Sequence, residues 1–325
     1  MFRLICTGMA TAFGRRLGAT ALCAVVLLAG CGGGDRLKGT SSISECMDPR
    51  DARSADVRRN LQALRGAPIC YRRQEVNEGG FRWVFHVLEH TKAPDGPFWI
   101  LPHDNENAAF DAGVHALITY GGGLLAVDTG GSRNFSGQDP NRNFGTSRAE
   151  ARTCRAQRRP APVFTRAVLD HYRAGKRKGR GPYLALHNNG DGHAGSGGYG
   201  NISMALGGPG LSHWPGASSG SRALRDEDNL VFMAGTRPLG GDPAMRQQVA
   251  ALNRAGLNVI YKHVTADNFD CSLSDYIARH RLGEYYNIEA QHGARSAQIE
   301  MVDRLMAVLG IRPLQAKSRP NPFLQ

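Results

Sequence analysis

Apolar, β-rich runs alternate with helix-length segments along most of this 325-residue chain, and this alternation restricts the fold more than any other feature. The runs that predict strands lie at 81–88, 98–101, 123–127, 183–186, 229–233, 258–261 and 285–288. Apolar residues at helical spacing predict helices near 51–65, 106–119, 163–174, 243–255, 272–281 and 294–309. Strands separated by helices typically form one sheet with a helical layer on each face. We therefore predict an α/β fold, with a single mixed, mostly parallel sheet sandwiched by helices.

The first thirty residues are typical of an export signal. They carry three arginines and no acidic residue, and residues 17–30 form an apolar run that is too short for an ordinary membrane span. The run ends in Leu-Ala-Gly-Cys, which looks like a bacterial lipobox with Cys31 as the lipidated residue. A plain signal peptide with an incidental cysteine is the alternative. We predict three segments: a lipoprotein signal peptide at 1–30, a flexible tether at 31–45 and a folded domain at 46–325.

These features also predict a compartment. A lipid on Cys31 would anchor the chain to a membrane and place the domain in the periplasm. Gly32 stands where an Asp would favour retention in the inner membrane, so we expect the outer membrane rather than the inner one. Four cysteines remain in the folded part, namely Cys46, Cys70, Cys154 and Cys271. In an oxidising compartment they predict two disulfides in one of three connectivities, with free buried thiols as the alternative.

The mature chain is basic. Loss of residues 1–30 removes three arginines and no acids, so the net charge falls from +12 to +9. Ten of the basic residues lie between Arg152 and Arg180, in either a solvated helix face or a patch for an anionic surface. Residues 190–220 are rich in Gly and predict a long loop that could form one wall of a site. This loop lacks the Lys of a phosphate-binding loop, and we expect neither nucleotide nor nucleic acid as a partner.

Candidate metal ligands follow two predicted strands. His103 and Glu106, three residues apart in a turn after the strand 98–101, can direct an imidazole and a carboxylate at one ion. His187 ends the strand 183–186 and is the best candidate for a third ligand. A second His-x-x-Glu, at His86 and Glu89, lies inside a strand, where residues three apart point to opposite faces, so we interpret it as structural.

Two further groups of residues complete the pattern. Asn141 and Arg142, in the run Asp-Pro-Asn-Arg-Asn that starts at Asp139, offer amide and guanidinium donors suited to a carboxylate. Asp139 could accept a hydrogen bond from the ring nitrogen of a metal-bound imidazole that does not bind the metal. Glu289 lies at the end of the strand 285–288 and could act as a general base, with Glu284 as the alternative.

In this order, the motifs resemble the zinc carboxypeptidase (metallocarboxypeptidase) superfamily over about 98–309. The resemblance implies that one zinc ion is bound by His103, Glu106 and His187, and that Glu289 activates the water that attacks the substrate. It further implies that Arg133 polarises the substrate carbonyl and that Asn141 and Arg142 hold the substrate carboxylate. Asp139 would hydrogen-bond the His103 ring. Tyr261 would be the mobile Tyr that covers the substrate, with Tyr276 as the alternative.

The resemblance predicts a zinc-dependent hydrolase that cleaves a C-terminal peptide bond, or a related amide, next to a free carboxylate. The export signal favours cell-wall peptides as substrates. Within the same superfamily, the alternative is an N-acyl amino acid deacylase similar to aspartoacylase and succinylglutamate desuccinylase. A lipoprotein that binds peptides on such a scaffold without cutting them is the third alternative.

Overall fold

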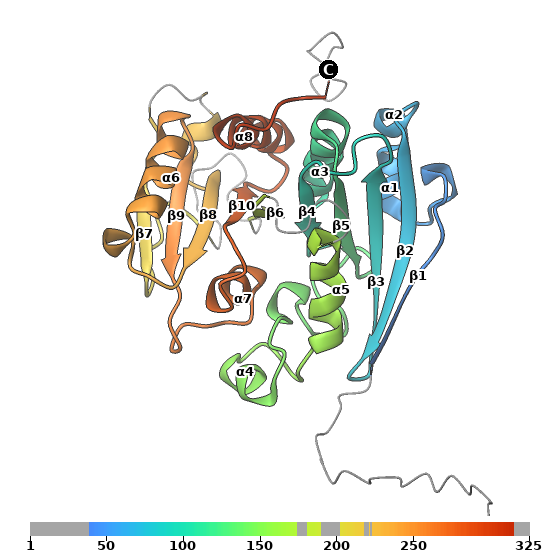
Figure 1. Cartoon of the computed structure of the whole chain (residues 1–325), viewed down its shortest axis with the longest axis horizontal. Helices are drawn as coiled ribbons and strands as arrows, with labels where there is room; N and C mark the ends of the chain where they lie inside the picture. The colour runs from blue at the N-terminus through green and yellow to red at the C-terminus, as the bar shows by residue number, and fades with distance from the viewer. Residues whose placement is uncertain (1–38, 174–180, 190–201, 218–220, 222, 315–325) are drawn as a thin grey trace, which may run out of the picture. The chain divides into compact units, whose positions relative to one another are not determined.

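One ten-stranded sheet organises the described part of the chain (Figure 1). The computed structural model describes residues 39–173, 181–189, 202–217, 221 and 223–314. The strands are β1 Gly39–Ile43, β2 Ile69–Glu78, β3 Phe81–His90, β4 Phe98–Leu101, β5 Gly123–Asp128, β6 Tyr183–Asn188, β7 Leu211–Trp214, β8 Leu230–Gly235, β9 Asn258–His263 and β10 Tyr285–Ala290. Their order across the sheet is β1-β2-β3-β5-β4-β6-β10-β8-β9-β7.

The centre of the sheet is parallel. β5, β4, β6 and β10 are parallel neighbours, as are β8 and β9, whereas the other neighbouring strands are antiparallel. The predicted α/β fold with a single mixed sheet is therefore confirmed. The parallel pairs need long crossover connections, and several of the helices that cover the sheet lie in these connections.

Helices cover both faces of the sheet (Figure 1). They are α1 Ala55–Arg59, α2 Leu61–Leu64, α3 Asn107–Tyr120, α4 Arg148–Thr153, α5 Pro162–Arg173, α6 Pro243–Arg254, α7 Leu273–Arg279 and α8 Arg295–Val308. Side chains of α3, α6 and α8 share one buried apolar cluster with alternate residues of the central strands. Side chains of α5 and α7 share a second cluster with the intervening strand residues. None of the helices in these ranges is long and apolar enough to cross a lipid bilayer.

The structure corrects the predicted tether. Residues 39–43 form β1, which pairs antiparallel with β2, although all five residues are exposed. An edge strand is held by backbone hydrogen bonds and needs no apolar pattern, so the sequence did not reveal it. The strands β2 and β7 were also missed, because β2 carries charged residues and β7 is only partly buried. Residues 1–38, including Cys31, lie outside the described residues, so the signal, the lipidation and the tether over 31–38 stay predictions.

Two disulfides connect distant parts of the domain. Cys46 is bonded to Cys70 in β2, and Cys154 at the end of α4 is bonded to Cys271, just before α7. The prediction of two disulfides is confirmed, and one of the three connectivities is selected. The second bridge joins residues 117 positions apart and holds α4 against the loop that leads into α7.

Candidate metal centre

The candidate site lies at the carboxyl ends of three adjacent parallel strands. His103 and Glu106 follow β4, His187 lies in β6, and Glu289 lies in β10. His187 and Glu289 are register partners, so their side chains leave the sheet on the same face. Ligands of open α/β sheets bind at this edge, and the sequence prediction rested on the same reasoning.

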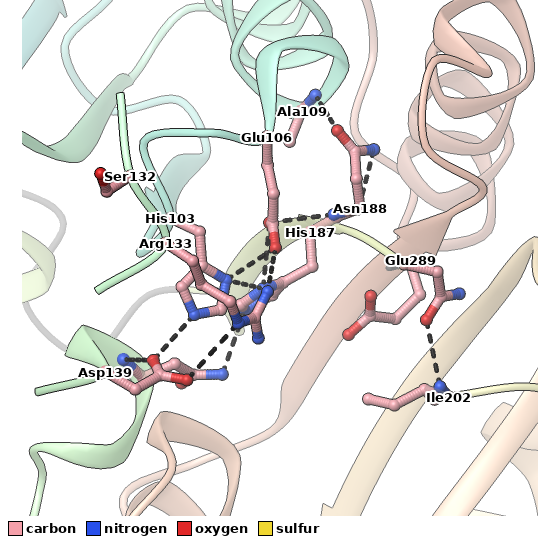
Figure 2. Close-up of polar contacts among 12 residues, drawn as sticks. His103, Glu106, Ala109, Ser132, Arg133, Asp139, His187, Asn188, Ile202 and Glu289 are labelled. Carbon is pink, nitrogen blue, oxygen red and sulfur yellow. Dashed lines mark hydrogen bonds and ion pairs between the residues drawn. The ribbon is translucent and has the colours of Figure 1, made fainter. Parts of the chain in front are cut away.

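Three buried side chains converge at this edge (Figure 2). The atoms that His103, Glu106 and His187 would offer to a metal all lie within 4.8 Å of one another. His103 Nδ1 is 2.7 Å from Glu106 Oε1 and 3.1 Å from His187 Nδ1, and Glu106 Oε2 is 3.3 Å from His187 Nδ1. Two ligands of one zinc ion are about 3.4 Å apart at tetrahedral geometry, so the three groups have compatible spacing.

The charges around His103 favour a cation at this point. Burial opposes the charge of its imidazole, but the carboxylates of Glu106 and Asp139 outweigh burial and raise the pKa of His103 to about 8. Burial likewise opposes the charge of Glu106, yet His103 and His187 hold its pKa well below the usual range. A group of two imidazoles and one buried carboxylate matches the ligand set of catalytic zinc sites. The residues present therefore fit a divalent metal ion.

Neighbouring side chains hold this group in place. Asp139 Oδ1 accepts a hydrogen bond from His103 Nε2 at 2.8 Å, which leaves Nδ1 directed at the other two groups. Burial opposes ionisation of Asp139, but the hydrogen bond from His103 lowers its pKa to about 2. Arg133 Nη1 lies 2.8 Å from Glu106 Oε1, so the guanidinium contacts the candidate ligand group; its role in polarising a substrate carbonyl stays a prediction. Asp104 accepts hydrogen bonds from the backbone N–H groups of Thr129 (2.9 Å) and Gly131 (2.6 Å), which fixes the loop that carries His103.

The first turn of α3 is capped from another strand. Glu106 is the N-cap residue of α3, but its side chain makes no capping hydrogen bond, because it points into the group with the two histidines. Asn188, at the end of β6, takes over this role: its Oδ1 accepts from Ala109 N at 3.1 Å, and its backbone N–H donates to Glu106 Oε2 at 2.9 Å. Asn188 Nδ2 donates to Gln298 Oε1 at 2.8 Å, and Gln298 Nε2 donates to the carbonyl of His187 at 2.8 Å. Asn188 and Gln298 thus join β6, α3 and α8 directly behind the candidate ligands.

Glu289 stands beside the group. It is buried, and Figure 2 shows its carboxylate directed towards His187 and the other candidate ligands. Asn287 Nδ2, two residues earlier on the same strand face, donates to Glu289 Oε1 at 2.8 Å. Burial, followed by the repulsion from Glu106, raises the pKa of Glu289 above the usual value of 4.5, despite the attraction of His187. A carboxylate with a raised pKa beside a metal site is well placed to accept and return a proton.

A pocket of about 300 Å³ adjoins Glu289. Asn141, Arg142 and Glu289 all line it, so the structure brings the predicted carboxylate-binding pair and the predicted base to one cavity. Asn141 lies between the pocket and the metal group, because its Nδ2 is 3.4 Å from His187 Nε2. The described part of the Gly-rich segment contributes Ile202, Pro209 and Leu211 to the wall; residues 190–201 lie outside the described residues.

Two charged residues of this pocket, Lys262 and Asp270, were not predicted from the sequence. Lys262, in β9, lies 3.4 Å from Asp270 and 2.8 Å from the fully buried Asp275. Asp270 Oδ2 is also 3.5 Å from Arg142, so it lies between the two cations. Lys262 directly follows the predicted strand 258–261, and the strand-end argument that found His187 could have found it. No local signal in the sequence links Lys262 with Asp270.

The predicted substrate-covering Tyr is wrong. Tyr261 is buried in the apolar cluster on the other face of the sheet, and its hydroxyl donates to the carbonyl of Arg237 at 2.6 Å. Strand alternation turns Tyr261 away from the pocket, which its neighbour Lys262 lines. The alternative, Tyr276, packs against Phe144 and His280 and is not among the residues that line the pocket.

The alternative residues also lie away from the site. Glu284 is exposed at the start of β10, at the opposite end of that strand from Glu289. His86 faces Tyr71 and Asp128, with its ring nitrogens 2.9 and 3.0 Å from their oxygens, while Glu89 lies beside Arg72. The structural interpretation of His86 and Glu89 therefore fits their surroundings.

Comparisons with known proteins give a fold-level likeness. No family model matches the chain, and the search of curated proteins found no match. A metallopeptidase candidate from Shewanella denitrificans has 13% identity and a TM-score of 0.42, with 80% of this chain and 90% of that chain covered. Another from Shewanella amazonensis has 15% identity and a TM-score of 0.38, with 72% and 84% covered. Succinylglutamate desuccinylase from Chromobacterium violaceum has 14% identity and a TM-score of 0.38, with 74% and 70% covered. Because their TM-scores are below 0.5, these likenesses assign neither a family nor a reaction to the chain. Any proposal about the reaction must therefore be argued from the chain's own side chains.

Proposed function

We propose that the chain is a zinc-dependent hydrolase that cleaves a C-terminal peptide bond, or a related amide, next to a free carboxylate. The observation that carries this proposal is the convergence of His103, Glu106 and His187 beside a pocket lined by Glu289 and Arg142. Exposed acidic groups are common without a metal, but these three residues are buried. A buried His-Glu-His group next to a buried base and a carboxylate-binding pair is suited to hydrolysis.

Arg142 and Asn141 would bind the substrate carboxylate. The guanidinium of Arg142 lines the pocket and can present two parallel N–H donors to the two carboxylate oxygens. Its Nη1 donates to the carbonyl of Asn141 at 3.0 Å, which restricts the rotation of the side chain. Asn141 is itself held, because its Oδ1 accepts from the backbone N–H of Leu273 at 3.2 Å. The pair is therefore fixed before substrate arrives, which lowers the entropic cost of binding.

Glu289 would move the proton of the reaction. His103, Glu106 and His187 would hold the zinc ion, which would supply Lewis-acid chemistry at the scissile carbonyl and lower the pKa of water towards about 7. The Glu289 carboxylate would take a proton from the attacking water and then pass it to the nitrogen of the leaving amine. Asn287 fixes the orientation of this carboxylate through its hydrogen bond to Oε1. Asp139 would keep the His103 ring in place throughout, and Arg133 would stabilise negative charge that develops on the substrate oxygen.

The deacylase alternative uses the same side chains. An N-acyl amino acid also carries a free carboxylate for Arg142 and an amide bond for hydrolysis. Hydrolysis rates on blocked dipeptides and on N-acetyl and N-succinyl amino acids separate the two activities. We further propose that the protein is a periplasmic lipoprotein anchored through Cys31 to the outer membrane, where cell-wall peptides would be available as substrates. This location rests on the sequence of residues 1–32.

The test combines metal analysis with one isosteric substitution. We expect one zinc ion per chain, and we expect hydrolysis to stop on chelation and to return with added zinc. Glu289→Gln should lower kcat by about 10²–10⁴-fold, because the base is lost while the shape is kept. Its zinc content should not change. Glu284→Gln, an exposed change at the other end of β10, is the matched control and should leave the rate unchanged. Full turnover by Glu289→Gln, or activity that survives complete zinc removal, would contradict the mechanism, and full zinc content without hydrolysis would favour a binding protein.

A further inference from the structure

Part of the basic stretch, together with Arg148 just before it, is exposed to solvent. Six arginines lie between positions 148 and 166, on α4, on the connection to α5 and on the first two turns of α5, and all six are exposed. We call this the arginine surface: Arg148, Arg152, Arg155, Arg158, Arg159 and Arg166. Glu150 is the only acidic residue in this interval. It is buried, and its Oε1 pairs with His280 at 2.9 Å. The charge that this segment presents to solvent is therefore wholly positive.

The backbone that carries these arginines is well fixed. The disulfide between Cys154 and Cys271 holds the end of α4. Arg158 N donates to Gln138 Oε1 at 3.1 Å, and Gln138 is buried behind the loop that carries Asn141 and Arg142. Because the backbone is already fixed, binding through these guanidinium groups adds little further cost in backbone entropy.

The N-terminal segment enters the domain beside the arginine surface. Gly39, the first described residue, pairs with Glu78 at the end of β2. Arg159 Nη1 donates to the carbonyl of the next residue, Gly79, at 2.9 Å. A Cβ on Gly39 would lie 2.8 Å from Val163 Cγ2, so the start of β1 contacts the first turn of α5. Figure 1 shows α4 and the start of α5 at the same end of the sheet as the turn between β2 and β3.

The chain length limits the distance to any anchor on Cys31. Gly39 follows Cys31 by eight residues, which span at most about 28 Å when fully extended. A lipid on Cys31 would therefore keep the arginine surface within reach of the bilayer. An anchor on a distant part of the domain would impose no such limit on this surface.

We propose that the arginine surface docks the domain on a lipid bilayer that contains anionic phospholipids. Guanidinium groups bind phosphate oxygens through paired hydrogen bonds, and they do so more specifically than ammonium groups. A lipid bilayer is favoured over a soluble acidic polymer because the export segment enters the domain at this same surface. The docking is independent of the proposed hydrolysis, since none of the six arginines lines the pocket.

The experiment compares vesicle binding by the full chain and by two matched triple variants. All proteins carry Cys31→Ala, so that no acyl chain contributes. The vesicles are either pure phosphatidylcholine or contain roughly a third phosphatidylglycerol. The first variant is Arg152→Gln, Arg155→Gln and Arg166→Gln; these side chains are exposed. The control variant is Arg225→Gln, Arg246→Gln and Arg254→Gln, which makes the same change of charge on exposed residues whose neighbours Leu224, Val249 and Leu252 belong to the cluster on the opposite face of the sheet.

Each arginine near an anionic bilayer changes affinity by about five-fold, so the first variant should lose about 100-fold on phosphatidylglycerol vesicles. The control variant should change by only a few-fold, and binding to phosphatidylcholine should be the same for all three proteins. Lysine at positions 152, 155 and 166 should restore most of the affinity, because the positive charges return, and an unchanged circular dichroism spectrum checks that the glutamine variants fold. Equal losses in both triple variants would overturn the proposal, because net charge alone would then explain binding. A surface variant that keeps vesicle binding but loses binding to soluble polyphosphate would overturn it in favour of an acidic polymer.

Discussion

Substitution of Asn188 tests whether the candidate ligands depend on the residues behind them. In Asn188→Ala, the backbone N–H of Ala109 loses its cap, and Glu106 cannot replace it while its carboxylate faces the histidines. Loss of a helix cap costs about 1 kcal/mol. Gln298, which is fully buried, is left with an unpaired Oε1, and a buried acceptor without a partner costs about 1–3 kcal/mol. The expected loss in the free energy of unfolding is therefore about 2–4 kcal/mol.

The same substitution should weaken the metal site. Asn188 and Gln298 fix the main chain of His187, so their loss loosens one ligand and the first turn of α3. Changes behind metal ligands typically lower metal affinity by about 10–100-fold. The assay is urea unfolding of metal-free protein, followed by zinc titration with a competing chelator. Asn77→Ala, an exposed change in β2, is the control and should stay within about 0.5 kcal/mol.

A double variant checks the assignment to the Gln298 contact. Asn188→Ala together with Gln298→Met removes both members of the hydrogen bond, so the cost should be smaller than the sum of the two single changes. If Asn188→Ala unfolds within about 0.5 kcal/mol of the native protein and binds zinc equally well, the proposed support of the ligands is refuted.

Three other predictions concern substrate binding, protonation and crosslinking. Arg142→Lys should raise KM by about 10-fold or more with a smaller effect on kcat, because a paired contact to the carboxylate becomes a single one; an unchanged KM on carboxylate substrates would argue against that role. Metal-free protein should lose up to about 2 kcal/mol of stability as pH rises from 6.5 through 8, because His103 has a folded pKa of about 8 and its proton binding stabilises the folded state only below that pH. Unfolding of the His103→Asn variant should lack this slope, and a native protein whose stability rises over the same interval would contradict it. Replacing Cys154 and Cys271 by Ala should lower the free energy of unfolding by roughly 4–5 kcal/mol on the chain-entropy model, which is more than the loss expected for the bridge between Cys46 and Cys70. Chemical unfolding measures both losses, and a smaller loss for the Cys154–Cys271 bridge would contradict the prediction.

The sequence revealed the strands that are buried on both faces but not those at the edges. Buried parallel strands such as β6 are continuous apolar runs, and all six strands that have a parallel neighbour were found, as was the antiparallel β3. β2 carries Arg72, Arg73 and Glu75, which an edge region tolerates because solvent reaches these side chains. Pairing of β1 with β2 depends on backbone groups, which have no signature in the sequence.

The candidate ligands could be predicted because each follows an apolar run, whereas the face that each residue occupies could not. Tyr261 and Lys262 are adjacent in the chain, and only the orientation of β9 decides which of them lines the pocket. The approach of Asp270 to Arg142 and Lys262 depends on the loop that the second disulfide holds. Such contacts follow from the tertiary arrangement and from no local pattern.

Register between β6 and β10 is the structural quantity on which the site depends most. Leu186 and Ile288 are partners in this register, and both are buried in the cluster under α3 and α8. Their next residues, His187 and Glu289, are consequently partners on the opposite face, beside the pocket. A shift of β10 by one residue would place Ile288 on the polar face and turn Glu289 into the apolar cluster, which costs both the burial of Ile288 and the desolvation of a carboxylate. Burial of the apolar residues Leu186 and Ile288 therefore fixes the register that places Glu289 beside His187.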